Sequence, residues 1–119
     1  MVRRKPGQLL PLEHRVLSAA AEIHRSDERA FHGYAMARQL QGNLGGRRLT
    51  SHGTLYKALS RLHRAGLLSA TWENSESAAS EDRPRRRLYE ITGLGFEVLN
   101  LADRDEPLPV SVITGLSPA

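Results

Sequence analysis

Apolar residues recur every three to four positions in four segments of the chain, which is the spacing of one buried face of an α-helix. The predicted helices run from Leu10 to about His24, from Gly33 or Tyr34 to Gln41, within Leu49–Leu68, and from Thr92 to about Asp103. The pattern changes to alternation over residues 67–73 and 85–92, which predicts two strands. Between them, the polar segment 74–83 predicts a mobile loop, so the two strands form a hairpin.

The central helix within Leu49–Leu68 has two different faces. Its apolar stripe consists of Leu55, Leu59 and Leu62. Thr50 or Ser51 can cap its start, and Gly66 can end it in the left-handed conformation. The opposite face holds only neutral or basic polar side chains: His52, Tyr56, Lys57, Ser60, Arg61 and Arg64. Most surface helices mix both charges to form pairs, so a face without carboxylates favours a polyanionic partner.

The order of helix, helix, helix, strand, loop, strand and helix is typical of a winged helix-turn-helix: mainly α, with a two-stranded wing and a C-terminal helix. In this fold the third helix enters the DNA major groove. We expect a domain over residues 9–104. Residues 1–8 form a basic arm, for which a disordered terminus is favoured over a phosphate-binding segment. Residues 105–119 form a Pro-rich tail with an extended backbone.

Charge is concentrated in the middle of the chain. The net charge is +4, and residues 47–89 carry nine Lys or Arg against four Asp or Glu, whereas residues 90–119 carry one against five. A basic block around an acid-free helix face is expected of a nucleic-acid-binding protein.

Several other classes of protein have no support in the sequence. The chain has no cysteine, no signal peptide and no apolar run long enough to span a membrane, so we expect a cytoplasmic protein. The five histidines lack metal-ligand spacing, no phosphate-binding loop occurs, and no cofactor is expected. Ser51 and His52 are adjacent, which does not support a nucleophile–base pair, and we expect no enzymatic activity.

Four sequence segments carry a resemblance to a known family. They are His32-Gly-Tyr-Ala-Met36, Gly53-Thr-Leu-Tyr-Lys-Ala-Leu-Ser-Arg-Leu62, Gly66-Leu-Leu68 and Asp82-Arg-Pro-Arg-Arg-Arg-Leu-Tyr-Glu-Ile-Thr92. Together they closely resemble the PadR-like transcriptional regulators over about residues 9–104. The resemblance implies a repressor that binds inverted-repeat DNA as a homodimer, often released by a small hydrophobic effector. Lys57 replaces a proline common in the family, and the short C-terminal part leaves the first and last helices for the dimer.

The candidate DNA-binding residues lie in the central helix and in the wing: Ser51, His52, Gly53, Thr54, Tyr56, Lys57, Arg61, Arg83, Arg85 and Arg86. Ser51 either caps the helix or contacts a base, and Tyr56 either approaches phosphate or packs. Arg64 either binds phosphate or offsets the helix dipole. Among the wing arginines, Arg83 and Arg85 are the strongest candidates.

Two functions remain open from the sequence. The first is a sequence-specific DNA-binding repressor. The second is a winged-helix adaptor that binds proteins, with Val110–Leu116 as an extended docking segment. Trp72 is expected in the core at the base of the hairpin.

Overall fold

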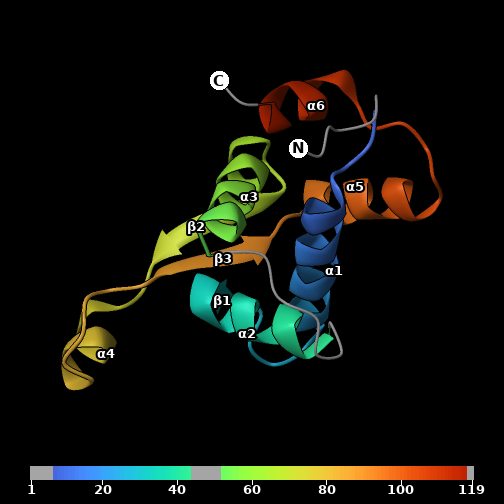
Figure 1. The fold of residues 1–119 in the computed structure, drawn as a ribbon. Helices are drawn as coiled ribbons and strands as arrows, with labels where there is room; N and C mark the ends of the chain where they lie inside the picture. The colour runs from blue at the N-terminus through green and yellow to red at the C-terminus, as the bar shows by residue number, and fades with distance from the viewer. Residues whose placement is uncertain (1–6, 44–51, 118–119) are drawn as a thin grey trace.

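The computed structural model describes residues 7–43 and 52–117 of the chain (Figure 1). Its elements are α1 (Pro11–Arg25), β1 (Phe31–His32), α2 (Gly33–Asn43), α3 (His52–Arg64), β2 (Leu68–Trp72), α4 (Ser75–Ser80), β3 (Arg87–Ile91), α5 (Gly93–Asp103) and α6 (Val110–Leu116). The predicted winged helix-turn-helix is confirmed: α1, α2 and α3 are followed by the β2–β3 hairpin and by α5. No helix among the described residues is long and apolar enough to cross a membrane.

α1 is the central helix of the body and packs against α2, α3, α5 and β3. Val16, Leu17 and Ala20 are fully buried along one side, as their helical spacing predicts. Pro11 is the first residue of α1, where its missing N–H has no partner to lose. The first helix therefore forms where the sequence predicts it, within one residue at each end.

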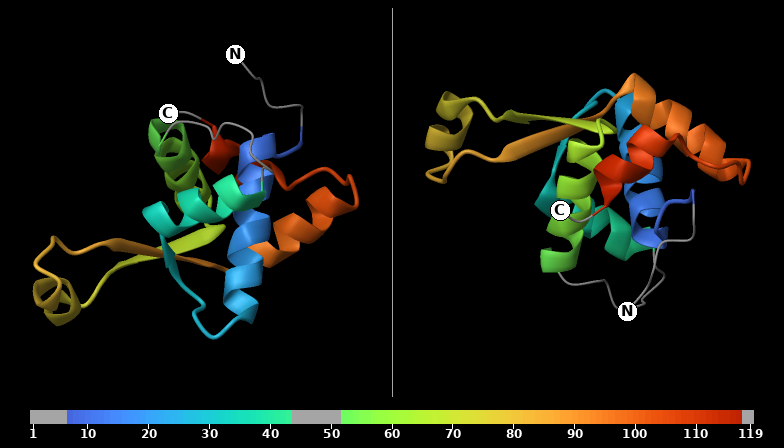
Figure 2. Two further views of the ribbon diagram at one scale, coloured as in Figure 1. Left: turned by 60° about the horizontal axis from the view of Figure 1, so that its bottom comes forward. Right: turned by 90° about the horizontal axis from the view of Figure 1, so that it is seen from above.

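The sheet has three antiparallel strands in the order β1-β3-β2. In the hairpin, Leu68 pairs with Ile91 at the buried end and Trp72 pairs with Arg87 at the outer end. β1 was not predicted, because two residues are too short to show an alternating pattern. Figure 2 shows the hairpin projecting from the helical body, with α4 at its tip.

The segment expected to be a mobile loop contains the short helix α4, so that expectation is wrong. Asn74 begins the helix: its side-chain oxygen accepts a hydrogen bond of 2.7 Å from the N–H of Glu76. Ala78 is buried, although the sequence around it is almost entirely polar. A helix of six residues with one buried apolar side chain is too short to show a helical period in the sequence, which explains the wrong prediction.

Gly66 and Thr92 fix the two ends of the hairpin at the body. Gly66 has a φ of +83° and ends α3 as predicted. The hydroxyl of Thr92 accepts a bond of 3.0 Å from the N–H of Gly95 and donates one of 2.7 Å to the carbonyl of Gly66. At Gly95, an added Cβ would overlap the carbonyl oxygen of Leu67, so only glycine allows this approach.

The expected extended tail is wrong, because α6 folds back onto α3. Val112 and Leu116 are buried, and the N–H of Leu108 donates a bond of 2.8 Å to the carbonyl of Gly7. Pro109 stands at the N-cap of α6, so it starts this helix without interrupting it. The C-terminal apolar residues thereby join the core.

Trp72 does not lie in the core, contrary to the prediction. Its side chain is 57% exposed, and the guanidinium carbon of Arg87 lies 5.4 Å from the centre of its ring. Trp72 is the last residue of β2, in the hairpin that projects from the helical body (Figure 2). Trp72 is instead a surface aromatic residue in contact with a cation.

One charged pair lies inside the helical body. Glu13 of α1 is fully buried, and its carboxylate accepts bonds of 2.9 Å from Nε of Arg61 and 2.8 Å from the N–H of Leu10. Arg61 belongs to α3 and is 19% exposed. The pair therefore ties α3 to α1.

Replacement of Arg61 alone should destabilise the protein strongly. Arg61→Met removes the guanidinium that pairs with the buried carboxylate of Glu13, and we expect a loss of about 2–4 kcal/mol in the free energy of unfolding. Glu13→Met combined with Arg61→Met removes both charges and should cost less than the single change. Urea denaturation followed by circular dichroism measures both variants. A double variant less stable than Arg61→Met would contradict this account.

Candidate nucleic-acid interface

The exposed side of α3 contains four of the predicted DNA-binding residues. Gly53, Thr54 and Lys57 are exposed, and Tyr56 is 47% exposed. A Cβ added at Gly53 would meet no atom within 4 Å, so the surface over this turn is open. His52 is the first residue of α3, and Ser51 lies outside the described residues. The start of α3 thus offers an accessible face with no carboxylate of its own.

Two arginines of α3 bond to other elements of the protein. Arg61 pairs with Glu13 as described above. Arg64 donates bonds of 3.1 Å to the carbonyl of Gly115 and 2.6 Å to that of Ser117, at the end of α6. A cation there satisfies carbonyls that the last turn of a helix leaves without a partner. Both side chains hold α3 in place.

Aromatic and basic side chains converge where α2, α3 and β3 meet. Two adjoining pockets share His32, Tyr34 and Arg86. We call these pockets together the aromatic–basic groove; their remaining lining residues are Gly33, Ala35, Arg38, Tyr56, Arg87 and Tyr89. None of the described residues that line these two pockets is acidic. The groove therefore joins the start of α2 to the exposed face of α3 and to the base of the hairpin.

Gly33 allows Tyr56 to reach the groove. A Cβ at Gly33 would lie 2.8 Å from the hydroxyl oxygen of Tyr56, well inside van der Waals contact. The phenol ring thus lies directly against the start of α2, and the ring of His32 stacks on Tyr34 at a centroid distance of 6.4 Å. This arrangement places polar edges of aromatic side chains beside arginine guanidinium groups.

Both ring nitrogens of His32 face hydrogen-bond donors. Its Nδ1 accepts a bond of 3.2 Å from the N–H of Ala35, and its Nε2 lies 3.0 Å from Nη1 of Arg86. Burial lowers the pKa of His32, and the positive charge of Arg86 lowers it further. An imidazolium would point two N–H groups at two donors, so the protonated form is disfavoured.

The four arginines near β3 have different surroundings. Arg83 forms ion pairs with Glu73 and Glu81 and is 19% exposed. Arg85 is exposed, with its Nε 2.8 Å from the carbonyl oxygen of Glu73. Arg86 reaches His32, and Arg87 lies over Trp72. Arg86 and Arg87 thus line the aromatic–basic groove, and Arg85 is exposed on the hairpin. The guanidinium of Arg83 instead pairs with carboxylates of the protein itself.

The sequence prediction missed part of this surface. Tyr34 and Arg38 line the groove but were not among the candidates. Tyr34 lies within a motif that carries the family resemblance, and this was the one available signal. Arg38 sits on a helix whose outer face shows no charge pattern, so the sequence offered no reason to choose it.

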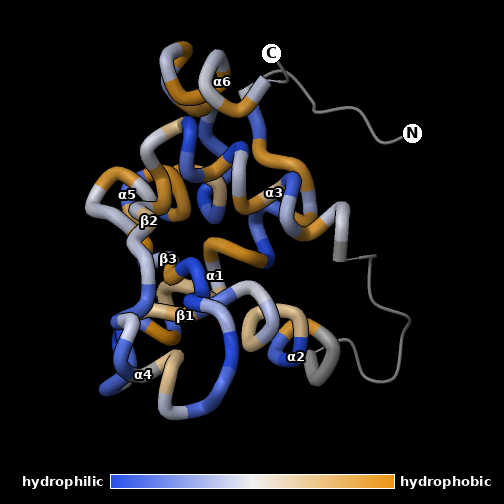
Figure 3. Tube along the Cα trace, turned by 90° about the vertical axis from the view of Figure 1, so that its left-hand side faces the viewer, coloured by the Kyte–Doolittle hydropathy of each residue, from blue (hydrophilic) through white to orange (hydrophobic). Residues whose placement is uncertain are grey.

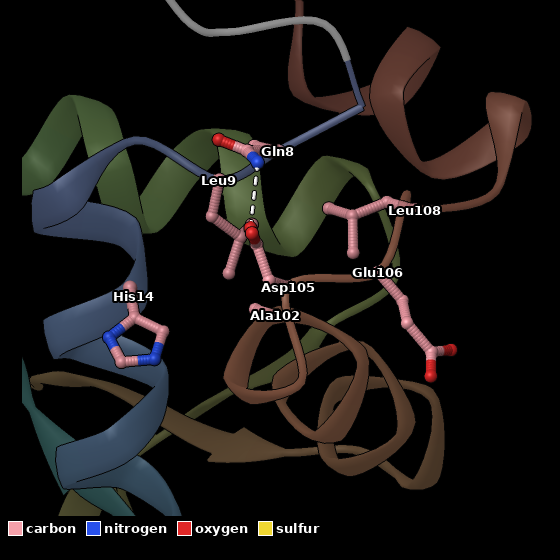
Figure 4. A pocket seen from close by; sticks show the side chains of 7 residues that line it. All are labelled: Gln8, Leu9, His14, Ala102, Asp105, Glu106 and Leu108. Carbon is pink, nitrogen blue, oxygen red and sulfur yellow. Dashed lines mark hydrogen bonds between the residues drawn. The ribbon is translucent and has the colours of Figure 1, made fainter.

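A further pocket lies between the start of α1 and the end of α5, away from the hairpin (Figure 4). Gln8 donates a bond of 2.9 Å to Asp105 there, and His14 pairs with Asp103 at 2.7 Å. The carboxylates of Asp105 and Glu106 line this pocket, and negative charge repels phosphate.

Within residues 7–43 and 52–117, no group of three His, Asp or Glu side chains could hold a metal ion.

A protein-family model described as "Transcriptional regulator PadR-like family" matches residues 23–101. The matched range includes α2, α3, the hairpin and most of α5. No curated protein matches the sequence.

Solved structures share the fold. A transcriptional regulator from Clostridium thermocellum has a TM-score of 0.63 and 19% identity, with 79% of this chain and 78% of that chain covered. A PadR family transcription regulator from Clostridium difficile has a TM-score of 0.61 and 21% identity, with 79% of this chain and 84% of that chain covered. A PadR family transcriptional regulator from Eggerthella lenta has a TM-score of 0.57 and 26% identity, with 79% of this chain and 76% of that chain covered.

His32 should titrate below the ordinary value of 6.5. Two-dimensional NMR of the imidazole C–H groups as a function of pH measures its pKa. In Arg86→Gln, the pKa of His32 should rise, because the nearby positive charge is lost while burial remains. A wild-type pKa at or above 6.5 would contradict the geometry described here.

Proposed function

Because the chain belongs to the PadR-like family of transcriptional regulators, we propose that it is a sequence-specific repressor that binds an inverted-repeat operator as a homodimer. The observation that carries the proposal is the continuous surface formed by the exposed face of α3 and the aromatic–basic groove. The relatives are transcription regulators and not enzymes, which agrees with a binding function. The protein would act in the cytoplasm, where chromosomal DNA is accessible.

The start of α3 would read the major groove. Residues at the N-terminal end of a recognition helix approach base edges in helix-turn-helix proteins. Gly53 leaves room for the DNA, and Thr54 and Lys57 are exposed beside it. Ser51 and His52 precede them in the chain and remain candidates for base contacts.

The aromatic–basic groove would bind the DNA backbone. Tyr34 and Tyr56 present hydroxyl groups, and Arg38, Arg86 and Arg87 present guanidinium groups, which are suited to phosphate oxygens. Arg85 extends this surface along the hairpin. We assign Arg61 and Arg83 to the support of the interface, because both are paired with carboxylates inside the protein.

The homodimer follows from the proposed operator. Two copies related by a twofold axis present two α3 helices to two half-sites. The proposed contacts between the copies remain α1 and α5, the first helix and the helix that follows Thr92. A small hydrophobic effector also remains part of the proposal. The adaptor alternative has lost its main support, since Val112 and Leu116 are buried in α6 and do not form a free docking strand.

Selection of bound sequences from random duplex DNA at near-physiological salt tests the function. We expect an inverted repeat with half-sites about one helical turn apart. Sedimentation of the protein with one recovered operator should show two chains per duplex. Recovery of no motif, with binding that disappears as salt rises, would leave only nonspecific attraction and would contradict the proposal.

Neutralising a cation of the interface should weaken binding in a salt-dependent manner. Lys57→Gln and Arg86→Gln should each reduce the slope of log Kd against log salt by about one, because one fewer phosphate is neutralised. Arg104→Gln, which removes the same charge from the exposed end of α5, is the matched control and should leave the slope unchanged. Fluorescence anisotropy of labelled operator at several salt concentrations provides the slopes. Equal slopes for Arg86→Gln and Arg104→Gln would remove the groove from the interface.

A further inference from the structure

Glu73 is an acidic residue in the middle of the most basic part of the hairpin. It follows β2 directly, and the arginines of the other side precede β3. Its carboxylate accepts bonds of 2.5 Å from Nη1 of Arg83 and 2.8 Å from Nη2 of Arg83, a bidentate pair. Glu73 and Arg83 are only 16% and 19% exposed, so solvent screens this pair less than it screens a surface pair.

Glu73 also bonds to Arg85 and Arg86. Its carbonyl accepts a bond of 2.8 Å from Nε of Arg85, and its Oε1 accepts one of 3.3 Å from the N–H of Arg86. Its own N–H donates a bond of 2.8 Å to the carbonyl of Arg86. One glutamate therefore contacts three successive wing arginines of the opposite segment.

These bonds continue the hairpin beyond the paired strands. The strand register ends at Trp72 and Arg87, and the contacts of Glu73 close the segment that carries α4. Arg85 and Arg86 lie outside the strand pairing, so the bonds to Glu73 take the place of the hydrogen bonds that the sheet gives to its own residues. The Arg83 side chain keeps the carboxylate of Glu73 charged, with its pKa lowered to about 2.

We propose that Glu73 is a positioning residue for DNA binding: paired with Arg83, it fixes the side chain of Arg85 and the backbone of Arg86 just beyond the paired strands. The inference rests on the proposed function and deepens it. Arg83 acts through Glu73 and makes no DNA contact of its own. The interface thus depends on a negative charge within a surface that binds a polyanion.

The proposal predicts the opposite sign to simple charge counting. Removal of a carboxylate near DNA reduces repulsion and should strengthen binding if the residue has no positioning role. Glu76 provides the matched control, because it is an exposed carboxylate in α4, three residues further along the chain. Glu73→Gln and Glu76→Gln make the same change in net charge and nearly the same change in shape.

The experiment compares the affinities of these variants for the operator recovered by selection. We expect Glu73→Gln to bind about fivefold more weakly than wild type. Glu76→Gln should bind as wild type or up to about twofold more tightly. Arg83→Gln should resemble Glu73→Gln and keep the wild-type salt slope, because its charge is already compensated within the protein. The double variant should be no weaker than either single variant, since both break the same pair.

A second measurement reports on the hairpin itself. The chain contains one tryptophan, Trp72, next to Glu73, so the fluorescence anisotropy of this residue follows motion at the outer end of the paired strands. The anisotropy should fall in Glu73→Gln and Arg83→Gln and stay unchanged in Glu76→Gln. Thermal unfolding of all variants identifies any general loss of structure, and Glu73→Asp, which keeps the charge, should recover part of the affinity.

The outcomes separate the inference from the proposed function. If wild type binds an operator and Glu73→Gln binds equally or more tightly, Glu73 has no positioning role. If Arg83→Gln lowers the salt slope by about one, Arg83 contacts phosphate directly and the assignment made here is wrong. If wild type selects no DNA sequence, the proposed function fails. The Trp72 anisotropy still tests whether Glu73 orders the outer end of the hairpin.

Discussion

The buried contact between Glu13 and Arg61 fixes the orientation of α3 relative to α1. A carboxylate with no exposed surface requires a cation, and the guanidinium that satisfies it comes from α3, the helix proposed to read the major groove. Glu13 also accepts a bond from the backbone at the start of α1. The orientation of α3 is therefore fixed by a directional pair in addition to the apolar stripe, which alone would allow it to rotate slightly or slide.

Charged residues have two separate tasks in this protein. Arg61, Arg64 and Arg83 bond to Glu13, to the end of α6 and to Glu73, and each contact holds one element against another. Lys57 and Arg85 are exposed on the surface of α3 and the hairpin. Figure 3 shows hydrophilic residues at the hairpin end and hydrophobic residues in the helical body, so the apolar core contributes little to the shape of the wing. Ion pairs and hydrogen bonds are the main means left to order it.

The sequence was sufficient for the elements that have a long repeating pattern or a strong boundary signal. α1, α3 and α5 could be predicted because their apolar spacing extends over several turns and because Pro11, Gly66 and Thr92 mark their ends. α6 could not, since the two prolines before it indicate an interruption unless its contacts with α3 are known. The exposure of Trp72 also depends on a tertiary fact, namely how far the hairpin extends beyond the helices.

The same limit applies to the interface. Sequence alone identifies a basic helix face and an arginine-rich strand, but it treats all arginines of a cluster alike. The difference between Arg83 and Arg86 arises from a glutamate ten residues before Arg83 and from a histidine fifty-four residues before Arg86. Such partners meet only after β1 and β2 have paired with β3, because these two strands bring His32 and Glu73 to opposite edges of the arginine segment. The three-stranded sheet thus gives different partners to arginines that are equivalent in the sequence: Arg83 bonds to Glu73, and Arg86 bonds to His32. In the proposed interface, the role of each arginine is therefore decided by sheet pairing as much as by its charge.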